Sequence, residues 1–258
     1  MIITNKEKNN DFEKFFKQTD SSLLSTVMAV AMDMNASYNR LVEKYLPQAI
    51  IVYDRYHMQA QFGKEVLGVV RLEEARKHKH ISEEILAGIH EDTDKETRHK
   101  LKLQAKAEKH NYSKLKKARW TLLMRHEKLS EDRSTHLNTI LETHHDLAIC
   151  YAMKEEMCRL FSLTDPVLAK KGWNDWFQAA EESNIPALVR FANLKKSRIK
   201  GLIAHAKYPI STGKLEGFNN KIKVAKRIGY GYRNEDYFFK LIRYLSLPSV
   251  RNSFPNFP

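Results

Sequence analysis

The feature that most constrains the fold is a pair of short apolar runs, each of which stops at an aspartate. The first, LLSTVMAVAMDM over residues 23–34, has strand length, and its apolar part stops at Asp33. The second, QAIIVYD over residues 48–54, is rich in β-branched side chains and stops at Asp54. Between them, NASYNRLVEKYLP has apolar residues at helical spacing. Strand, helix and strand within about 30 residues predict a βαβ unit, and therefore a parallel or mixed sheet.

Both aspartates are candidate site residues because open α/β sheets build their sites at the carboxyl ends of parallel strands. The alternative is that Asp33, Asp54 or both cap the following helix, since Asp is a preferred N-cap residue. His57 follows Asp54 by one helical turn in the sequence DRYH. It is suited to a hydrogen bond with a carboxylate or a phosphate, and a purely structural Asp–His contact stays open.

The remainder of the chain has a helical pattern. Residues 11–19 predict a short amphipathic helix, and from about Arg55 to His205 apolar residues recur at spacings of three and four. Within that segment, residues 137–163 predict one buried helix, and residues 94–130 carry the heaviest positive charge. The fold class is therefore α/β by architecture and mostly α by residue count.

The charge of the chain indicates a polyanionic partner. Lysine and arginine number 44 against 31 aspartates and glutamates, which gives a formal net charge of +13. Nucleic acid is the partner that such a balance favours.

No apolar run approaches the roughly 20 residues that span a bilayer, and the first residues lack the apolar core of a signal peptide. We expect a cytoplasmic protein without a membrane partner or a small-molecule cofactor.

The cysteines and histidines do not indicate a disulfide or a zinc site. Cys150 and Cys158 lie eight residues apart in a helical pattern, about 12 Å at the helical rise, which is too far for a disulfide. We expect both to be core thiols. The eleven histidines show neither CxxC nor HExxH spacing.

A single acid precedes a dense set of amides and cations in STGKLEGFNNKIKVAKRIGYGYRN, residues 211–234. A helix that starts near Gly213 places Glu216, Lys223 and Arg227 on one face. The opposite stripe is Leu215, Phe218, Ile222 and Ala225. Carboxylates from separate elements are what a two-metal phosphoryl-transfer site requires, and neighbouring cations suit DNA phosphates. A solvated charged face is the alternative.

Trp120 lies in the most basic part of the chain. It either stacks on a DNA base or packs against Leu122 and Leu123 in the helical core, and we expect packing. Trp173 and Trp176, three residues apart, predict core packing as well.

The sequence resembles the DDE transposases of bacterial insertion sequences, specifically the ISL3-type group. The matching segments cover nearly the whole chain in order: VAMDMNASYNRLVEKYLPQAIIVYDRYHM, ARWTLLMRHEKLS, WNDWFQAAEESNIPALVRFA and ISTGKLEGFNNKIKVAKRIGYGYRN. The most specific part is DRYH combined with LEGFNNKIK. The resemblance implies a partial RNase H-like core in residues 1–57, a helical insertion in residues 58–205, and core helices carrying the glutamate in residues 206–258.

The resemblance also implies a chemistry. In these transposases three acids bind two divalent metals, water nicks the element end, and the freed 3′-hydroxyl attacks target DNA. Asp33 matches the second catalytic aspartate and Glu216 the catalytic glutamate, both as ligands of Mg²⁺ or Mn²⁺. Asp54 and His57 match a supporting DxxH signature. The implied DNA-binding residues are Lys221, Lys223, Lys226, Arg227, Arg119 and Trp120.

One departure from the family concerns the first aspartate, which lies on an opening strand upstream of the helix that here corresponds to residues 11–19. Asp11 and Asp20 do not match that position. We therefore expect an N-terminally truncated transposase whose two-metal site is incomplete and whose catalysis is suppressed by orders of magnitude. We also expect the strand Val27–Asp33 to be left exposed and the product to be poorly stable.

Two other functions stay open. One is a metal-dependent nuclease of RNase H-like fold, which needs a first acid. The other is a non-catalytic DNA-binding remnant that regulates full-length transposase. A homodimer stays open as the assembly.

Overall fold

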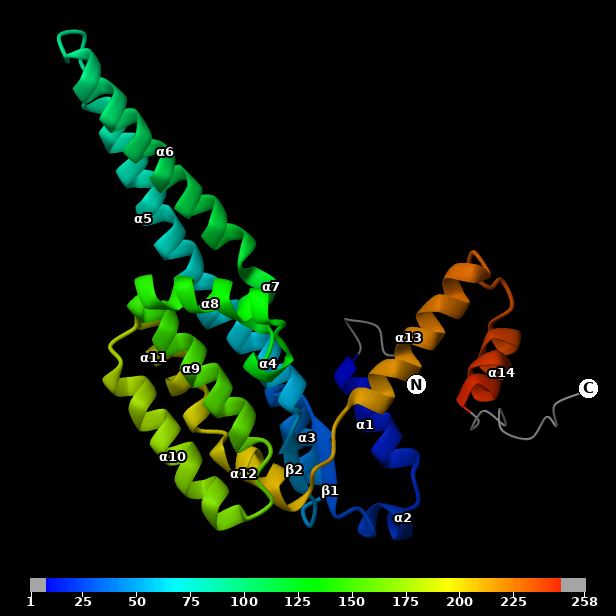
Figure 1. Cartoon of the computed structure of the whole chain (residues 1–258). Helices are drawn as coiled ribbons and strands as arrows, with labels where there is room; N and C mark the ends of the chain where they lie inside the picture. The colour runs from blue at the N-terminus through cyan, green and yellow to red at the C-terminus, as the bar shows by residue number, and fades with distance from the viewer. Residues whose placement is uncertain (1–7, 247–258) are drawn as a thin grey trace, which may run out of the picture. The chain divides into compact units, whose positions relative to one another are not determined.

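The computed structural model describes residues 8–246, with side chains from residue 12. The chain divides into two compact units, Met1–Ile210 and Ser211–Pro258. The first unit holds the strands and most of the helices, whereas the second holds the last two helices (Figure 1).

The predicted βαβ unit is present. Strand β1 (Ala29–Met32) pairs in parallel with β2 (Ile50–Tyr53), in a register that places Met32 opposite Tyr53. Helix α3 (Ala36–Tyr45) makes the crossover between them. Within residues 8–246 these two strands form the whole sheet.

The first strand is shorter than the sequence predicts, and this prediction was wrong at its start. Residues 21–25 form a short helix, α2 (Ser21–Ser25), in place of an extended segment. Asp20 caps this helix, because its side chain accepts a hydrogen bond from the Ser22 amide at 2.8 Å. Leu23 and Leu24 of the apolar run thus belong to a short capped helix.

Helix α1 (Lys8–Gln18) confirms the predicted N-terminal amphipathic helix. It packs on α3, and the two helices and β1 share a small core made of Phe16, Met32, Val42 and Leu46.

The segment after β2 is helical as predicted. Its elements are α4 (Arg55–Phe62), the π-helical turn η1 (Gly63–Leu67), α5 (Gly68–Ala87), α6 (Lys95–Lys117), α7 (Arg119–Leu123), the 3₁₀ turn η2 (His126–Lys128), α8 (Glu131–Thr143), α9 (His145–Leu160), α10 (Pro166–Glu182), α11 (Pro186–Lys196) and α12 (Ile199–Lys207). Helices α5 and α6 run side by side as a long hairpin (Figure 1). The single helix predicted over residues 137–163 is instead two, because the chain breaks at His144.

A large apolar core joins these helices to the sheet. Trp173 and Trp176 are 0% and 2% exposed, which confirms their predicted packing. Cys150 and Cys158 are buried free thiols, also as predicted. Helix α12 packs on β2 so closely that Gly201 lies against the Tyr53 ring.

The second unit pairs α13 (Gly213–Ile228) with α14 (Glu235–Ser246). Tyr232, in the connection, donates its hydroxyl to the Ala225 carbonyl at 3.2 Å, and its ring stacks on Phe238 at 4.8 Å. Gly231 adopts a φ of 91°, which favours glycine.

Among the described helices, none combines the length and the apolar character that crossing a bilayer requires.

Candidate active site and nucleic-acid interface

The carboxyl ends of β1 and β2 bring Asp33 and Asp54 to one edge of the sheet. Each aspartate directly follows the paired residues Met32 and Tyr53. The sheet ladder extends one step further, since the Asp54 amide donates to the Met32 carbonyl at 3.0 Å. The predicted juxtaposition of the two acids is therefore present.

Asp33 is half-buried and does not cap the next helix. One of its carboxylate oxygens accepts a hydrogen bond from the Asn35 amide at 3.1 Å. Asn35 itself caps α3 by accepting from the Ser37 amide at 2.9 Å. Within the part of the chain that is described, the second carboxylate oxygen of Asp33 makes no hydrogen bond or ion pair. Asp33 thus retains an oxygen suited to a hard cation.

Asp54 has a different environment. It is 1% exposed, and its side chain caps α4 by accepting from the amides of Tyr56 at 2.8 Å and His57 at 3.4 Å. The capping alternative is therefore confirmed for Asp54. A buried cap fixes the start of α4, and with it the position of His57.

His205, on α12, is a residue of this region that sequence reasoning missed. It is 6% exposed, and its ring lies 5.3 Å from that of Phe161. Burial, together with the positive charge of Arg55, lowers the pKa of His205, and Asp54 opposes that change. The ring is therefore neutral near pH 7. The sequence shows His205 as a lone histidine in a helical pattern, which does not indicate that it lies near Asp54 and Arg55.

Glu216 lies in the first turn of α13, as predicted. Thr212 donates its hydroxyl to a Glu216 carboxylate oxygen at 3.3 Å. A carboxylate at this position is favoured by the positive end of the helix. Because Glu216 belongs to the second unit, its pairing with Asp33 stays a prediction.

The predicted cationic face of α13 is accessible. The exposed cations are Lys221, Lys223, Lys226 and Arg227. The predicted apolar stripe is present only in part: Ile222 is 5% exposed, whereas Leu215 is 59% exposed.

Trp120 is 70% exposed, so the prediction that it packs in the helical core was wrong. Leu122, two residues later on α7, is 1% exposed. Positions i and i+2 of a helix point about 200° apart around its axis. Burial of Leu122 therefore turns Trp120 toward solvent. The guanidinium of Arg119 lies 5.1 Å from the centre of the Trp120 ring, a cation–π contact.

Helix α6 and the start of α7 carry cations without acidic partners. Within residues 8–246 the following exposed or half-buried side chains form no ion pair: Lys102, Lys106, Lys109, Lys114, Lys116, Lys117 and Arg119. A single paired lysine, Lys100 with Glu96 at 2.7 Å, stands near the other end of α6. Uncompensated charge beside an exposed tryptophan is suited to nucleic acid.

No cluster of three or more histidine, cysteine or acidic side chains able to hold a metal occurs among the described residues. Asp33 and Asp54 follow neighbouring strands of the first unit, and their carboxylates are hard oxygen donors of the kind that Mg²⁺ prefers.

Comparison with known proteins gives the family. A family model described as "Transposase", for ISL3-type DDE enzymes, matches residues 1–242. The chain belongs to the ISL3 family of DDE transposases. It is 32% identical over 229 residues to the transposase for insertion sequence element IS1001 of Bordetella parapertussis, which covers 89% of this chain and 50% of the relative. This ISL3-type chain therefore spans about half the length of that relative.

A second relative shares a shorter stretch. The transposase for insertion sequence element IS1557 of Mycobacterium tuberculosis is 30% identical over 143 residues, or 55% of this chain and 32% of the relative. No solved structure matches this ISL3-type chain. The family match includes the positions of Asp33, Asp54, Arg119 and Glu216.

Proposed function

We propose that this ISL3-type chain acts in DNA transposition, by nicking strands at the ends of an insertion sequence and joining the freed 3′-hydroxyl to target DNA. The observation that carries the proposal is the placement of Asp33 and Asp54 at the paired ends of two parallel strands, in a chain that the transposase family matches over residues 1–242.

The proposed architecture is an RNase H-like core made of residues 1–57 and 206–258, with residues 58–205 as a helical insertion. The βαβ unit supports the assignment of the first segment to an α/β core. Helix α12 crosses the proposed boundary at residue 205, and its packing on β2 favours placing that boundary before Ile199.

In the proposed site, Asp33 and Glu216 hold a divalent metal, with Mg²⁺ preferred and Mn²⁺ as the alternative. The metal supplies charge neutralisation and activation of an attacking oxygen when it is bound. The Asp33 carboxylate oxygen that has no hydrogen-bond partner among residues 8–246 supports this role. Asp54 and His57 are assigned a positioning role, because Asp54 is buried and fixes the first turn of α4.

The proposed DNA interface has two parts. On the first unit it comprises Arg119, Trp120 and the cationic side of α6. On the second unit it comprises Lys221, Lys223, Lys226 and Arg227. Their exposure supports contact with phosphates, and the exposure of Trp120 supports stacking on a base.

Strand nicking on a labelled DNA duplex with Mg²⁺ or Mn²⁺ tests the catalytic assignment. We expect Asp33→Asn and Glu216→Gln each to reduce nicking by orders of magnitude, because each removes a metal-binding charge. DNA retention on a filter should stay within about twofold of wild type, since neither side chain is a cation.

Asp132→Asn is the matched control, because Asp132 is an exposed acid on α8 that lies outside the proposed site. This variant should nick like wild type. Absence of metal-dependent nicking by the wild-type chain, or full nicking by both site variants, contradicts the catalytic proposal and leaves DNA binding as the function.

A further inference from the structure

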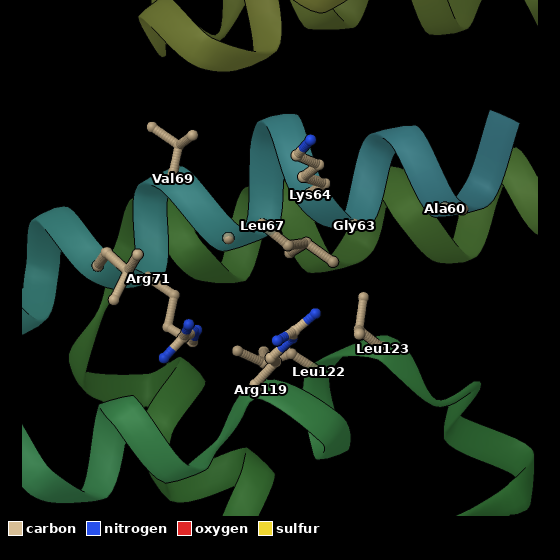
Figure 2. A pocket seen from close by; sticks show the side chains of 11 residues that line it. Ala60, Gly63, Lys64, Leu67, Val69, Arg71, Arg119, Leu122 and Leu123 are labelled. Carbon is tan, nitrogen blue, oxygen red and sulfur yellow. The ribbon is translucent and has the colours of Figure 1, made fainter. Parts of the chain in front are cut away.

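A cavity of about 430 Å³ lies between α7 and the continuous helix formed by α4, η1 and α5 (Figure 2). We call it the α5–α7 pocket. Its walls include Leu67, Leu122 and Leu123, and its charged lining residues are Lys64, Arg71 and Arg119. The pocket therefore combines aliphatic surface with two guanidinium groups, whereas the Lys64 side chain extends away from them in Figure 2.

Among the described residues, no carboxylate lines the α5–α7 pocket. Within residues 8–246, none of the three cations forms an ion pair. This differs from other cations of the same unit, such as Lys77, which pairs with Glu74 at 2.5 Å. Like charges around one cavity repel one another, so an anion in the cavity is stabilised.

Arg71 is held in place by its neighbours. It is 7% exposed, and one guanidinium nitrogen donates to the carbonyls of Leu115 at 3.0 Å and Lys116 at 2.8 Å. Burial lowers the pKa of Arg71, and the charge of Arg119 lowers it further. Figure 2 shows the guanidinium groups of Arg71 and Arg119 in the space between the helices. An arginine has five N–H donors, so Arg71 retains donors for a ligand.

Arg119 contacts Trp120, and the short helix that carries it is fixed at its end. Its guanidinium lies over the Trp120 ring. The end of α7 is fixed by Lys154, which is 4% exposed and donates to the carbonyls of Leu122 at 3.0 Å and Met124 at 2.5 Å. A cation that is held before binding loses less side-chain freedom when it contacts a ligand.

We propose that the α5–α7 pocket binds a nucleoside 5′-phosphate. Guanidinium groups pair with phosphate through two parallel hydrogen bonds and also stack on bases. The cavity lies within the range of about 300–1,000 Å³ that is typical of small-molecule sites, which is more room than a phosphate alone needs. Apolar lining residues that keep exposed surface, such as Ala60, Leu72 and Leu123, accommodate the apolar faces of the sugar and the base.

The same chemistry is available from two sources, the terminal nucleotide of single-stranded DNA and a free nucleotide. The inference goes beyond the proposed function, because binding in this pocket requires neither Asp33 nor Glu216. The two proposals can therefore fail separately.

Trp120 provides the readout. It is the exposed member of the three tryptophans, since Trp173 and Trp176 are buried, and it contacts Arg119. We expect dTMP to quench its fluorescence saturably. Inorganic phosphate and thymidine should each bind at least about tenfold more weakly, because each lacks half of the contacts. Equal binding of inorganic phosphate and dTMP overturns the assignment of a nucleotide.

Two variants test the location by calorimetric titration with dTMP. Arg119→Gln removes a lining charge, whereas Ala60→Phe fills the pocket from an exposed lining position without changing charge. Both should weaken dTMP binding by about tenfold or more. Arg76→Gln, an exposed arginine on α5 outside the lining, is the matched control and should bind like wild type. Unchanged binding in both pocket variants overturns the proposal.

Two ligand arms identify the source. Tighter binding of a 5′-phosphorylated single-stranded oligonucleotide than of dTTP identifies DNA, and the reverse identifies a free nucleotide. Either order supports the pocket. Retention of duplex DNA without any binding of dTMP or oligonucleotide overturns this inference while leaving the proposed DNA contact intact. Binding of dTMP without metal-dependent nicking supports this inference and contradicts the catalytic proposal.

Discussion

At the scale of single residues, Trp120 shows that composition around a residue does not determine its burial. Two leucines, Leu122 and Leu123, follow it closely, yet it is 70% exposed whereas Trp173 is fully buried. The difference comes from helical phase. Helix α7 has only five residues, so one buried leucine fixes which way every other side chain of the helix points.

Glu13 is a residue with a clear electrostatic role. It accepts a hydrogen bond from the Tyr45 hydroxyl at 2.6 Å and another from the Lys44 ammonium at 3.0 Å. The Tyr45 hydrogen bond, followed by that of Lys44, lowers the pKa of Glu13 from its ordinary 4.5 to about 2. This carboxylate therefore links α1 to α3 in its ionised form.

The lowered pKa predicts the acid dependence of stability. Because folding favours the ionised form, the contribution of Glu13 is present above pH 4.5 and is lost as the pH falls toward 2. Glu13→Gln should lower the midpoint of urea unfolding at pH 7, and its difference from wild type should shrink toward pH 2. Glu83→Gln, at an exposed pair 3.5 Å from Lys79, is the control and should change little. A difference between wild type and Glu13→Gln that is constant with pH contradicts this role.

At the scale of elements, the sequence predicts types better than boundaries. The strands are predictable because apolar runs and their terminal aspartates are local signals. The break at His144 is not predictable, because His144 contacts residues far along the chain. His144 contacts His78 nitrogen to nitrogen at 2.9 Å, and His78 contacts Glu108 at 2.5 Å. Such tertiary contacts override local helical periodicity.

Helix α12 lies on the sheet through a glycine. A Cβ atom at Gly201 would stand 2.5 Å from the Tyr53 ring and 3.3 Å from the Ile51 carbonyl. Close approach of the helix to β2 therefore requires glycine at this position. Gly217, on α13, is a contrasting case, because a Cβ atom there would meet nothing within 4 Å.

These two glycines give a matched pair of variants. Gly217→Ala, on the second unit, should raise the free energy of unfolding of that unit by about 0.5–1 kcal/mol, since alanine favours the helix. Gly201→Ala gains the same helix preference but displaces α12 from β2, and a net loss of about 1–3 kcal/mol is expected. Urea unfolding followed by circular dichroism measures both. Stabilisation by Gly201→Ala contradicts the close packing of α12 on the sheet.

At the scale of the whole molecule, the candidate site is only partly predictable from sequence. Asp33 and Asp54 could be paired because both end strands of one local βαβ unit. The α5–α7 pocket could not be predicted, because it joins Lys64 to Arg119 across the α5–α6 hairpin. Periodicity shows which face of a helix is apolar, but the choice of partner helix depends on packing over the entire unit.

The distribution of core residues predicts the behaviour of a shortened chain. Both described hydrophobic cores are built from residues of the first unit. Among residues 211–246, Ile222 is the one buried side chain. A chain of residues 1–210 should therefore unfold cooperatively, with a midpoint within about 5 °C of the full chain, which corresponds to roughly 1–2 kcal/mol.

The shortened chain should keep dTMP binding, because the lining of the α5–α7 pocket is complete. It should lose metal-dependent nicking, because Glu216 is absent. Thermal unfolding by circular dichroism, calorimetric titration and the nicking assay measure the three properties on one preparation. A broad, non-cooperative transition in the shortened chain contradicts the self-sufficiency of the first unit, and undiminished nicking contradicts the catalytic role of Glu216.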